Sequence, residues 1–303
     1  MTPSEPVPVL EIGGTHVTAA LVDLARGAVL PGSESRAALE GDAPAADLFA
    51  RILRCARSLT PPAGATWGVA LPGPFDYDTG IARFESVGKF DALNGVDVGA
   101  VLRRDLPGPP ANVKFVNDAI AFSLGEWAFG AGVGHQRVVG ITLGSGIGSG
   151  FLAGGVPVAK GPDVPTCGEV FRLRIDGRPL EDIVSRRALL RAYARAAPEH
   201  PVQDVREIAE RATTGDAAAE TVVRTAFTEL GAALAPWLSR FGATAVVMGG
   251  SMTRSWELIQ PFLISGFNRV EPLYPDRLDV FRAEDPERSA LLGAAWQSTR
   301  NGR

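Results

Sequence analysis

Residues 10–23, "LEIGGTHVTAALVD", place Gly13-Gly14-Thr15 between two runs of strand-favouring residues. Two glycines between such runs predict a β-hairpin. Residues 138–155, "VVGITLGSGIGSGFLAGG", repeat this order around Gly144-Ser145-Gly146. The two copies lie too far apart for a solenoid repeat, so the sequence predicts two related halves.

Further elements are expected from hydrophobic periodicity and turn residues. The expected strands are 7–12, 17–22, 66–71, 113–116, 137–143, 147–152 and 243–248. The expected helices are 47–59, 98–106, 180–197, 205–212 and 216–241, with one more after Gly249-Gly250-Ser251 and a last one from Asp285.

Composition and charge narrow the class of protein. A chain of 303 residues is long enough for one large or two ordinary domains. A net charge of −4 and a pI of about 5.5 give no electrostatic reason to expect nucleic acid or an anionic membrane as partner. The N-terminal residues lack a signal-peptide pattern, and Cys55 and Cys167 are too few for a disulfide framework. We therefore expect a cytoplasmic protein.

A carboxylate stands where a predicted strand ends, in residues 114–132, "KFVNDAIAFSLGEWAFGAG". The apolar run stops at Asn117-Asp118, and a helical pattern follows. Asn and Asp are favoured helix N-caps, because their side chains accept hydrogen bonds from free backbone N–H groups. A carboxylate at a strand end can also act as a general base. The dipeptide alone leaves both interpretations open.

The glycine-rich turns have two interpretations as well. "GSGIGSG", residues 144–150, contains a dinucleotide-binding pattern, but that pattern requires a helix after the glycines, and strand is expected there. A lysine is also missing where a Walker-type phosphate loop needs one. Each turn is either a plain hairpin or a set of backbone N–H groups that binds an anion. Gly249-Gly250 offers a third glycine turn, against which a purine could lie.

The motifs, taken together, resemble those of ROK-family sugar kinases. Eight stretches occur in the family's order: "LEIGGTHVTAALVD", "GVALPGPFDYDTG", "VNDAIAFSLGEWAFGAG", "TLGSGIGSGFLAGG", "CGEV", "GRPLEDIVSRRAL", "AVVMGGSM" and "SALLGAAW". The resemblance implies an α/β, two-lobed, actin/hexokinase-like (ribonuclease H-like) fold with duplicated βββαβαβα domains. It implies that nucleotide and sugar bind in a central cleft between a lobe of residues 1–117 plus 288–303 and a lobe of residues 118–287.

The resemblance also implies roles for residues at matching positions. Asp118 matches the catalytic base. The positions that match the ATP site are Gly13, Gly14, Thr15, Gly144, Ser145, Gly146, Gly249 and Gly250. The positions that match the sugar side are Pro72, Gly73, Asn117, Asp118, Glu169, Arg172 and Glu181.

The activity that the resemblance implies is ATP-dependent phosphorylation of a hexose, with glucose and its 6-hydroxyl expected first. Another sugar, such as fructose, mannose or an N-acetylated hexosamine, is an alternative, and so is polyphosphate as donor. A non-catalytic sugar-binding or regulatory protein is a further alternative, although no room is expected for a DNA-binding domain before the first hairpin. A homodimer is possible.

Three positions depart from the family pattern, and the first is Ser145, where Thr is usual. Glu11 stands where Asp is usual, and we expect it to reach Mg²⁺ through water. Arg172 replaces a histidine, and residues 171–182 contain no cysteine, so we expect no zinc. Arg172 could donate to a sugar hydroxyl, pair with Glu169 or Glu181, or favour an anionic substrate. The histidines, His16, His135 and His200, form no ligand pattern.

Overall fold

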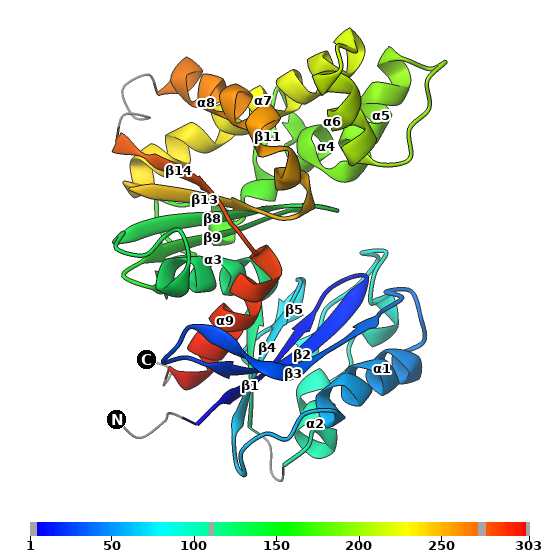
Figure 1. Ribbon diagram of the computed structural model, residues 1–303, viewed down its shortest axis with the longest axis vertical. Coiled ribbons are helices and arrows are strands. Elements are labelled where there is room, and N and C mark those ends of the chain that lie inside the picture. The colour runs from blue at the N-terminus through cyan, green and yellow to red at the C-terminus, as the bar shows by residue number, and fades with distance from the viewer. Residues whose placement is uncertain (1–4, 109–111, 272–276, 301–303) are drawn as a thin grey trace. The chain divides into compact units, whose positions relative to one another are not determined.

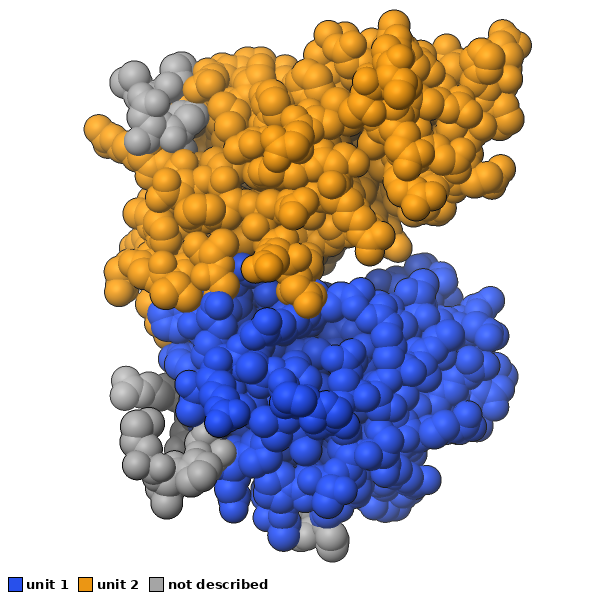
Figure 2. Space-filling model, in the orientation of Figure 1, with its two compact units in different colours: residues 1–129, 287–303 blue, residues 130–286 orange. Residues whose placement is uncertain are grey.

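The computed structural model describes residues 5–108, 112–271 and 277–300. The chain divides into two compact units, which Figure 2 colours separately: residues 1–129 with 287–303 form unit 1, and residues 130–286 form unit 2. Each unit combines one five-stranded sheet with helices.

The sheet of unit 1 has the order β3-β2-β1-β4-β7. Its strands are β1 (Val7–Ile12), β2 (His16–Asp23), β3 (Ala28–Ala38), β4 (Thr66–Leu71) and β7 (Asn112–Asn117). β1 pairs antiparallel with β2 and parallel with β4, which pairs parallel with β7. Because β1, β4 and β7 run in the same direction, their carboxyl ends meet at one edge of the sheet.

The helices of unit 1 cover this sheet and form its core. They are α1 (Ala45–Arg57), α2 (Val98–Asp105), α3 (Asp118–Phe129) and α9 (Pro286–Thr299), with short pieces β5 (Phe75–Asp76), β6 (Ile81–Ala82) and a 3-10 turn, Asp91–Leu93. The apolar face of α1 is buried with Trp67 of β4. α3 and α9 cross closely, because Gly125 and Gly293 each lie against the other helix's backbone.

Unit 2 repeats the sheet topology, with the order β10-β9-β8-β13-β14. Its strands are β8 (Arg137–Leu143), β9 (Ile147–Ala153), β10 (Val156–Pro157), β13 (Ala245–Gly249) and β14 (Asp279–Arg282). β8 pairs antiparallel with β9 and parallel with β13, which pairs parallel with β14. The order and the strand directions match those of unit 1, which confirms the predicted duplication.

Unit 2 contains the longest described helix, α7 with 25 residues, and its helices differ in one place from expectation. They are α4 (Glu181–Val184), α5 (Arg186–Ala196), α6 (Val205–Thr213), α7 (Ala217–Phe241) and α8 (Trp256–Val270), with the small hairpin β11 (Arg174–Ile175) and β12 (Arg178–Pro179). The single helix predicted over residues 180–197 is wrong. Ser185 leaves helical geometry and its hydroxyl accepts from the N–H of Ala188, so α5 begins anew with its own cap.

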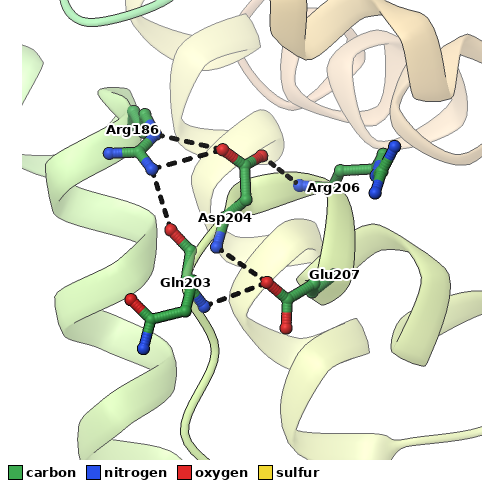
Figure 3. Close-up of polar contacts among 5 residues, drawn as sticks. All are labelled: Arg186, Gln203, Asp204, Arg206 and Glu207. Carbon is green, nitrogen blue, oxygen red and sulfur yellow. Dashed lines mark hydrogen bonds and ion pairs between the residues drawn. The ribbon is translucent and has the colours of Figure 1, made fainter.

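The N-cap residue of α6, Asp204, also contacts the first residue of α5 (Figure 3). Asp204 accepts from the N–H of Arg206, and Glu207 accepts from the N–H of Asp204, which forms a capping box. Asp204 also pairs with the guanidinium of Arg186 at 3.2 Å. The first residue of α5 is therefore fixed by its side chain.

Two strands of four or more residues, β3 and β14, were not predicted. β3 has no buried residue and contains Pro31 and Gly32, so no apolar run marks it in the sequence. β14 has only four residues and is half-exposed. The predicted lobe limits differ from those of the units by Glu287 and by the length of α3, which belongs with unit 1 because it packs on α9. No helix in the described residues is long and apolar enough to cross a membrane.

Candidate active site

Unit 1 gathers several predicted site residues at the carboxyl edge of its sheet. Glu11 of β1 pairs with Ala70 of β4, and Leu71 of β4 pairs with Asn117 of β7. Pro72-Gly73 follows β4 directly, and Asp118 follows β7. Three neighbouring parallel strands therefore place a carboxylate, a proline-glycine loop and an Asn-Asp pair at one edge.

Asn117 is the helix cap of this edge. Its Oδ1 accepts from the N–H groups of Ala119 at 3.0 Å and Ile120 at 3.3 Å. Its Nδ2 donates to the hydroxyl of Tyr77 at 3.0 Å, and that hydroxyl donates to the carbonyl of Leu71 at 3.2 Å. The capping interpretation therefore holds for Asn117, whose side chain is fixed at both of its polar atoms.

Asp118 is the first residue of α3, and its carboxylate is half-buried. Its Oδ1 accepts from the N–H of Ala119 at 2.8 Å. Burial raises the pKa of Asp118 above its ordinary value and the charge of Glu11 adds to this, while Lys89 and the Ala119 N–H act against it. A carboxylate with a raised pKa is a stronger base than a free one, which suits proton abstraction.

Glu11 has a partner that the sequence did not indicate. His16, the first residue of β2, brings its Nε2 within 3.2 Å of a Glu11 oxygen, and the side chains are 22% and 13% exposed, respectively. The hydrogen bond with Glu11 raises the pKa of His16. Glu11 pairs with Thr18 across the hairpin, and His16 lies two residues before Thr18 in β2. Side chains two residues apart on a strand point to the same face, so the position of His16 beside the turn was the available signal.

The first glycine turn lies between charged side chains. The N–H of Gly13 donates to the carbonyl of His16 at 2.9 Å, and the carbonyl of Thr15 accepts from Leu39 at 2.8 Å. A Cβ on Gly13 would lie 3.5 Å from Oε1 of Glu11. A Cβ on Gly14 would lie 3.5 Å from Cδ of Lys89, a residue that sequence reasoning missed.

In unit 2, the structure brings the other two glycine turns together. Gly249, the last residue of β13, pairs with Thr142 of β8, just before Gly144-Ser145-Gly146. Gly250 has φ of 90°, and a Cβ there would lie 2.3 Å from the carbonyl oxygen of Leu143. Only glycine fits this contact, so the turns after β8 and β13 lie side by side.

Glu181, the first residue of α4, lies against the turn after β8. Its Oε1 accepts from the N–H of Ile147 at 3.3 Å, and a Cβ on Gly146 would lie 2.2 Å from the same oxygen. The N–H of Arg186 donates to the carbonyl of Gly144 at 3.1 Å. The starts of α4 and α5 therefore hold this turn, with a carboxylate beside it.

Glu169 lies on a loop that β9 supports. The hydroxyl of Ser149 donates to the carbonyl of Gly168 at 2.6 Å and accepts from the N–H of Val170 at 3.0 Å. Arg172 forms an ion pair with Glu169, and its guanidinium lies 5.1 Å from the ring centre of Phe171. The sequence leaves several roles open for Arg172, and in the structure its guanidinium pairs with Glu169. The described residues contain no group of three or more His, Cys, Asp or Glu side chains that could hold a metal ion.

We predict that Gly146→Ala displaces the Glu181 carboxylate without disturbing the backbone. The new Cβ would clash with the end of a flexible side chain, so the free energy of unfolding should change by less than about 1 kcal/mol. The KM for the sugar should rise if Glu181 binds it. Gly144→Ala adds the same methyl group to the same turn and should leave the sugar KM unchanged, because its Cβ would have only the Ser251 hydroxyl nearby, at 4.0 Å. Both variants are compared at saturating ATP, because both glycines belong to the turn that resembles a phosphate loop. An unchanged sugar KM in Gly146→Ala would remove Glu181 from the sugar site.

Comparison with known proteins identifies the family. The model of the ROK family matches residues 8–300. The chain therefore belongs to the ROK family. It is 27% identical over 252 residues to a glucokinase of Thermotoga maritima. The aligned region covers 75% of this chain and 77% of that protein.

Solved structures agree with this assignment. A ROK-family glucokinase from Streptomyces griseus, in complex with glucose and AMPPNP, is 25% identical, with a TM-score of 0.74 and coverage of 98% of this chain and 100% of that one. A ROK hexokinase from Thermus thermophilus is similar in fold, with 24% identity, a TM-score of 0.76 and 97% coverage of both chains. The predictions of the actin/hexokinase-like fold and of a sugar kinase, a phosphotransferase, are confirmed.

Proposed function

We propose that the protein transfers the terminal phosphoryl group of ATP to a hexose, most readily to the 6-hydroxyl of glucose. The observation that carries this proposal is that the two residues at the end of β7 differ in their contacts. Asn117 caps α3, which leaves Asp118 as a half-buried carboxylate with a raised pKa. The names of the similar glucokinases support glucose as the sugar.

The proposed reaction needs one proton acceptor and fixed groups that align the substrates. Asp118 takes the proton of the attacking hydroxyl as the sugar oxygen bonds to the terminal phosphorus. The bond from that phosphorus to the bridging oxygen breaks, and ADP leaves with the electron pair. Alignment and charge stabilisation supply most of the rate in such transfers, so no covalent intermediate with the protein is required.

We assign the nucleotide to the three glycine turns. Gly13-Gly14-Thr15 and Gly144-Ser145-Gly146 would present backbone N–H groups to the phosphates, and the missing side chains allow close approach. Gly249-Gly250 would lie against the adenosine. In support, the turns after β8 and β13 lie side by side within unit 2.

We assign the sugar to the remaining motif residues. The second N–H of the Asn117 amide can donate to a hydroxyl, and Pro72-Gly73 lies at the same edge of the sheet. Glu169 and Glu181 would accept from further hydroxyls. Arg172 would act mainly by holding the Glu169 carboxylate in place, since its guanidinium already pairs with it.

Magnesium fits the chemistry of the residues present. Mg²⁺ in kinases is typically held by one or two carboxylates, several waters and the substrate phosphates. Glu11 supplies one such carboxylate beside the turn that we assign to the phosphates, and glycine at position 13 leaves room next to it. When bound, the ion would neutralise phosphate charge, and Glu11 would hold it through water.

The deciding experiment is a coupled assay of ADP release with a panel of acceptors. The panel contains glucose, mannose, fructose, N-acetylglucosamine, N-acetylmannosamine and gluconate, each with ATP. We expect the highest kcat/KM with glucose. A parallel assay with polyphosphate measures glucose 6-phosphate, because no ADP forms there. A higher kcat/KM with another sugar would replace glucose as substrate, and no turnover with any acceptor would contradict the kinase proposal.

A further inference from the structure

A lysine that no motif includes lies at the first glycine turn. Lys89 belongs to the loop between β6 and the 3-10 turn Asp91–Leu93, and backbone contacts fix this loop on both sides of it. The N–H of Phe90 donates to the carbonyl of Gly41 at 2.5 Å, and the ring of Phe90 is 1% exposed. The carboxylate of Asp91 accepts from the N–H of Gly88 at 3.2 Å. The backbone of Lys89 is therefore held firmly.

The aliphatic part of Lys89 lies across two glycines. A Cβ on Gly41 would lie 3.2 Å from Cβ of Lys89, and a Cβ on Gly14 would lie 3.5 Å from its Cδ. The side chain therefore runs from its anchored loop over the turn of the β1–β2 hairpin. A side chain on either glycine would take up space that the lysine uses.

The ammonium group of Lys89 has no partner in the described parts of the chain. Lys89 is half-buried, yet it makes no hydrogen bond or ion pair with any residue in 5–108, 112–271 or 277–300. By contrast, the other charged group beside this turn, Glu11, is paired with His16. An ammonium held over a glycine turn without an anion is suited to receive one.

Lys89 is also close enough to Asp118 for its charge to lower the pKa of that carboxyl group. Among the charged groups that act on Asp118, Lys89 favours the ionised carboxylate and Glu11 disfavours it. The ammonium is nevertheless not within ion-pair distance of that carboxylate, because no such pair occurs in the described residues. The positive charge therefore lies in the vicinity of both the glycine turn and the proposed base.

We propose that Lys89 binds the phosphoryl group that is transferred, at the turn Gly13-Gly14-Thr15. This inference rests on the proposed kinase function and adds a residue to it. A lysine is a compact point charge that suits phosphate oxygens, and charge on those oxygens is what a phosphotransferase must stabilise. Lys89 exchanges no proton in this step. It interacts with the phosphoryl oxygens while the bond to phosphorus moves from ADP to the sugar.

The test compares Lys89→Met with Lys89→Arg in the full chain. Methionine keeps most of the aliphatic contact with Gly14 and Gly41 but removes the charge. We expect Lys89→Met to lower kcat by about 10²- to 10³-fold, the range seen when one fixed donor to developing charge is removed. The KM for glucose should stay unchanged, and Lys89→Arg should restore part of the rate. Lys160→Met, at an exposed lysine of unit 2, is the control and should leave kcat unchanged.

Binding measurements distinguish phosphate recognition from a structural role. By calorimetry, Lys89→Met should bind AMPPNP at least about tenfold more weakly and adenosine as tightly as the unmodified protein, since losing one charge-assisted contact costs more than 1.4 kcal/mol. Equal AMPPNP affinity together with equal kcat would overturn the proposal. A rise in sugar KM alone, or a loss confined to gluconate, would also overturn it and assign Lys89 to the acceptor. If the chain phosphorylates no sugar, the proposed function fails, while the AMPPNP comparison still decides whether Lys89 binds phosphate.

Discussion

Asp118→Asn is expected to abolish nearly all turnover while substrate binding persists. The amide has almost the shape of the carboxylate, and its Oδ1 can still accept from the N–H of Ala119. It cannot take a proton from the attacking hydroxyl. We expect kcat to fall by about 10²- to 10⁴-fold, which is the usual contribution of a general base. The KM for glucose and the affinity for AMPPNP should change by less than about threefold, as measured by steady-state kinetics and calorimetry.

The same substitution should stabilise the fold at neutral pH. The pKa of Asp118 is raised in the folded protein, so the ionised carboxylate is less favourable there than in the unfolded chain. This cost is fully present above the folded pKa and disappears as the pH falls through that value towards the unfolded pKa. Asp118→Asn should therefore have a higher Tm than the unmodified protein at pH 7, and this difference should vanish in acid.

The pH dependence of the rate provides a further check. Activity requires the ionised base, so kcat/KM should decline on acidification at a higher pH than an ordinary aspartate would give. Asp78→Asn, at an exposed aspartate of unit 1, is the control and should alter neither rate nor Tm. An Asp118→Asn protein with more than about a tenth of the normal kcat would exclude Asp118 as the base.

Local chemistry made much of the fold predictable. The turn at Gly13-Gly14-Thr15 and its counterpart at Gly144-Ser145-Gly146 were predicted because a glycine turn between apolar runs is a short-range signal. A cap at Asn117 is a short-range signal of the same kind. Ser185 carried the same kind of signal, yet an uninterrupted helical pattern hid it. β3 escaped prediction because an exposed strand pairs through its backbone and needs no apolar run.

The candidate site was predictable only where family motifs covered it. The partners of the motif residues depend on contacts between segments that are distant in sequence. Lys89 lies on a loop with no pattern of its own, and it reaches Gly14 only after the chain has folded. The pairing of Arg172 with Glu169 was one of several possibilities, and local backbone geometry selected it. Sequence reasoning thus supplied the motif residues, whereas the structure supplied the charges around them.

Gly293→Ala is expected to destabilise unit 1 strongly, because it adds a methyl group where two helix backbones meet. A Cβ on Gly293 in α9 would lie 1.8 Å from the carbonyl oxygen of Ala121 in α3. That atom belongs to the backbone and cannot rotate away, so the two helices must separate. We expect a loss of at least about 3 kcal/mol, at the upper end of the range for overpacking. At about 2–4 °C per kcal/mol, Tm should fall by about 6–12 °C in scanning calorimetry.

The separation of these helices should also reduce activity, because α3 begins at Asp118. Moving α3 away from α9 shifts the proposed base relative to the strand ends of its own sheet, and a displacement of about 1 Å can cost about 10²-fold in rate. Thr299→Ala, at an exposed position of α9, is the control and should stay within about 0.5 kcal/mol of the unmodified protein. If Gly293→Ala melts within about 2 °C of the unmodified protein, α3 and α9 do not meet through their backbones. If it is strongly destabilised yet has full kcat below its Tm, the packing on α9 does not set the position of Asp118.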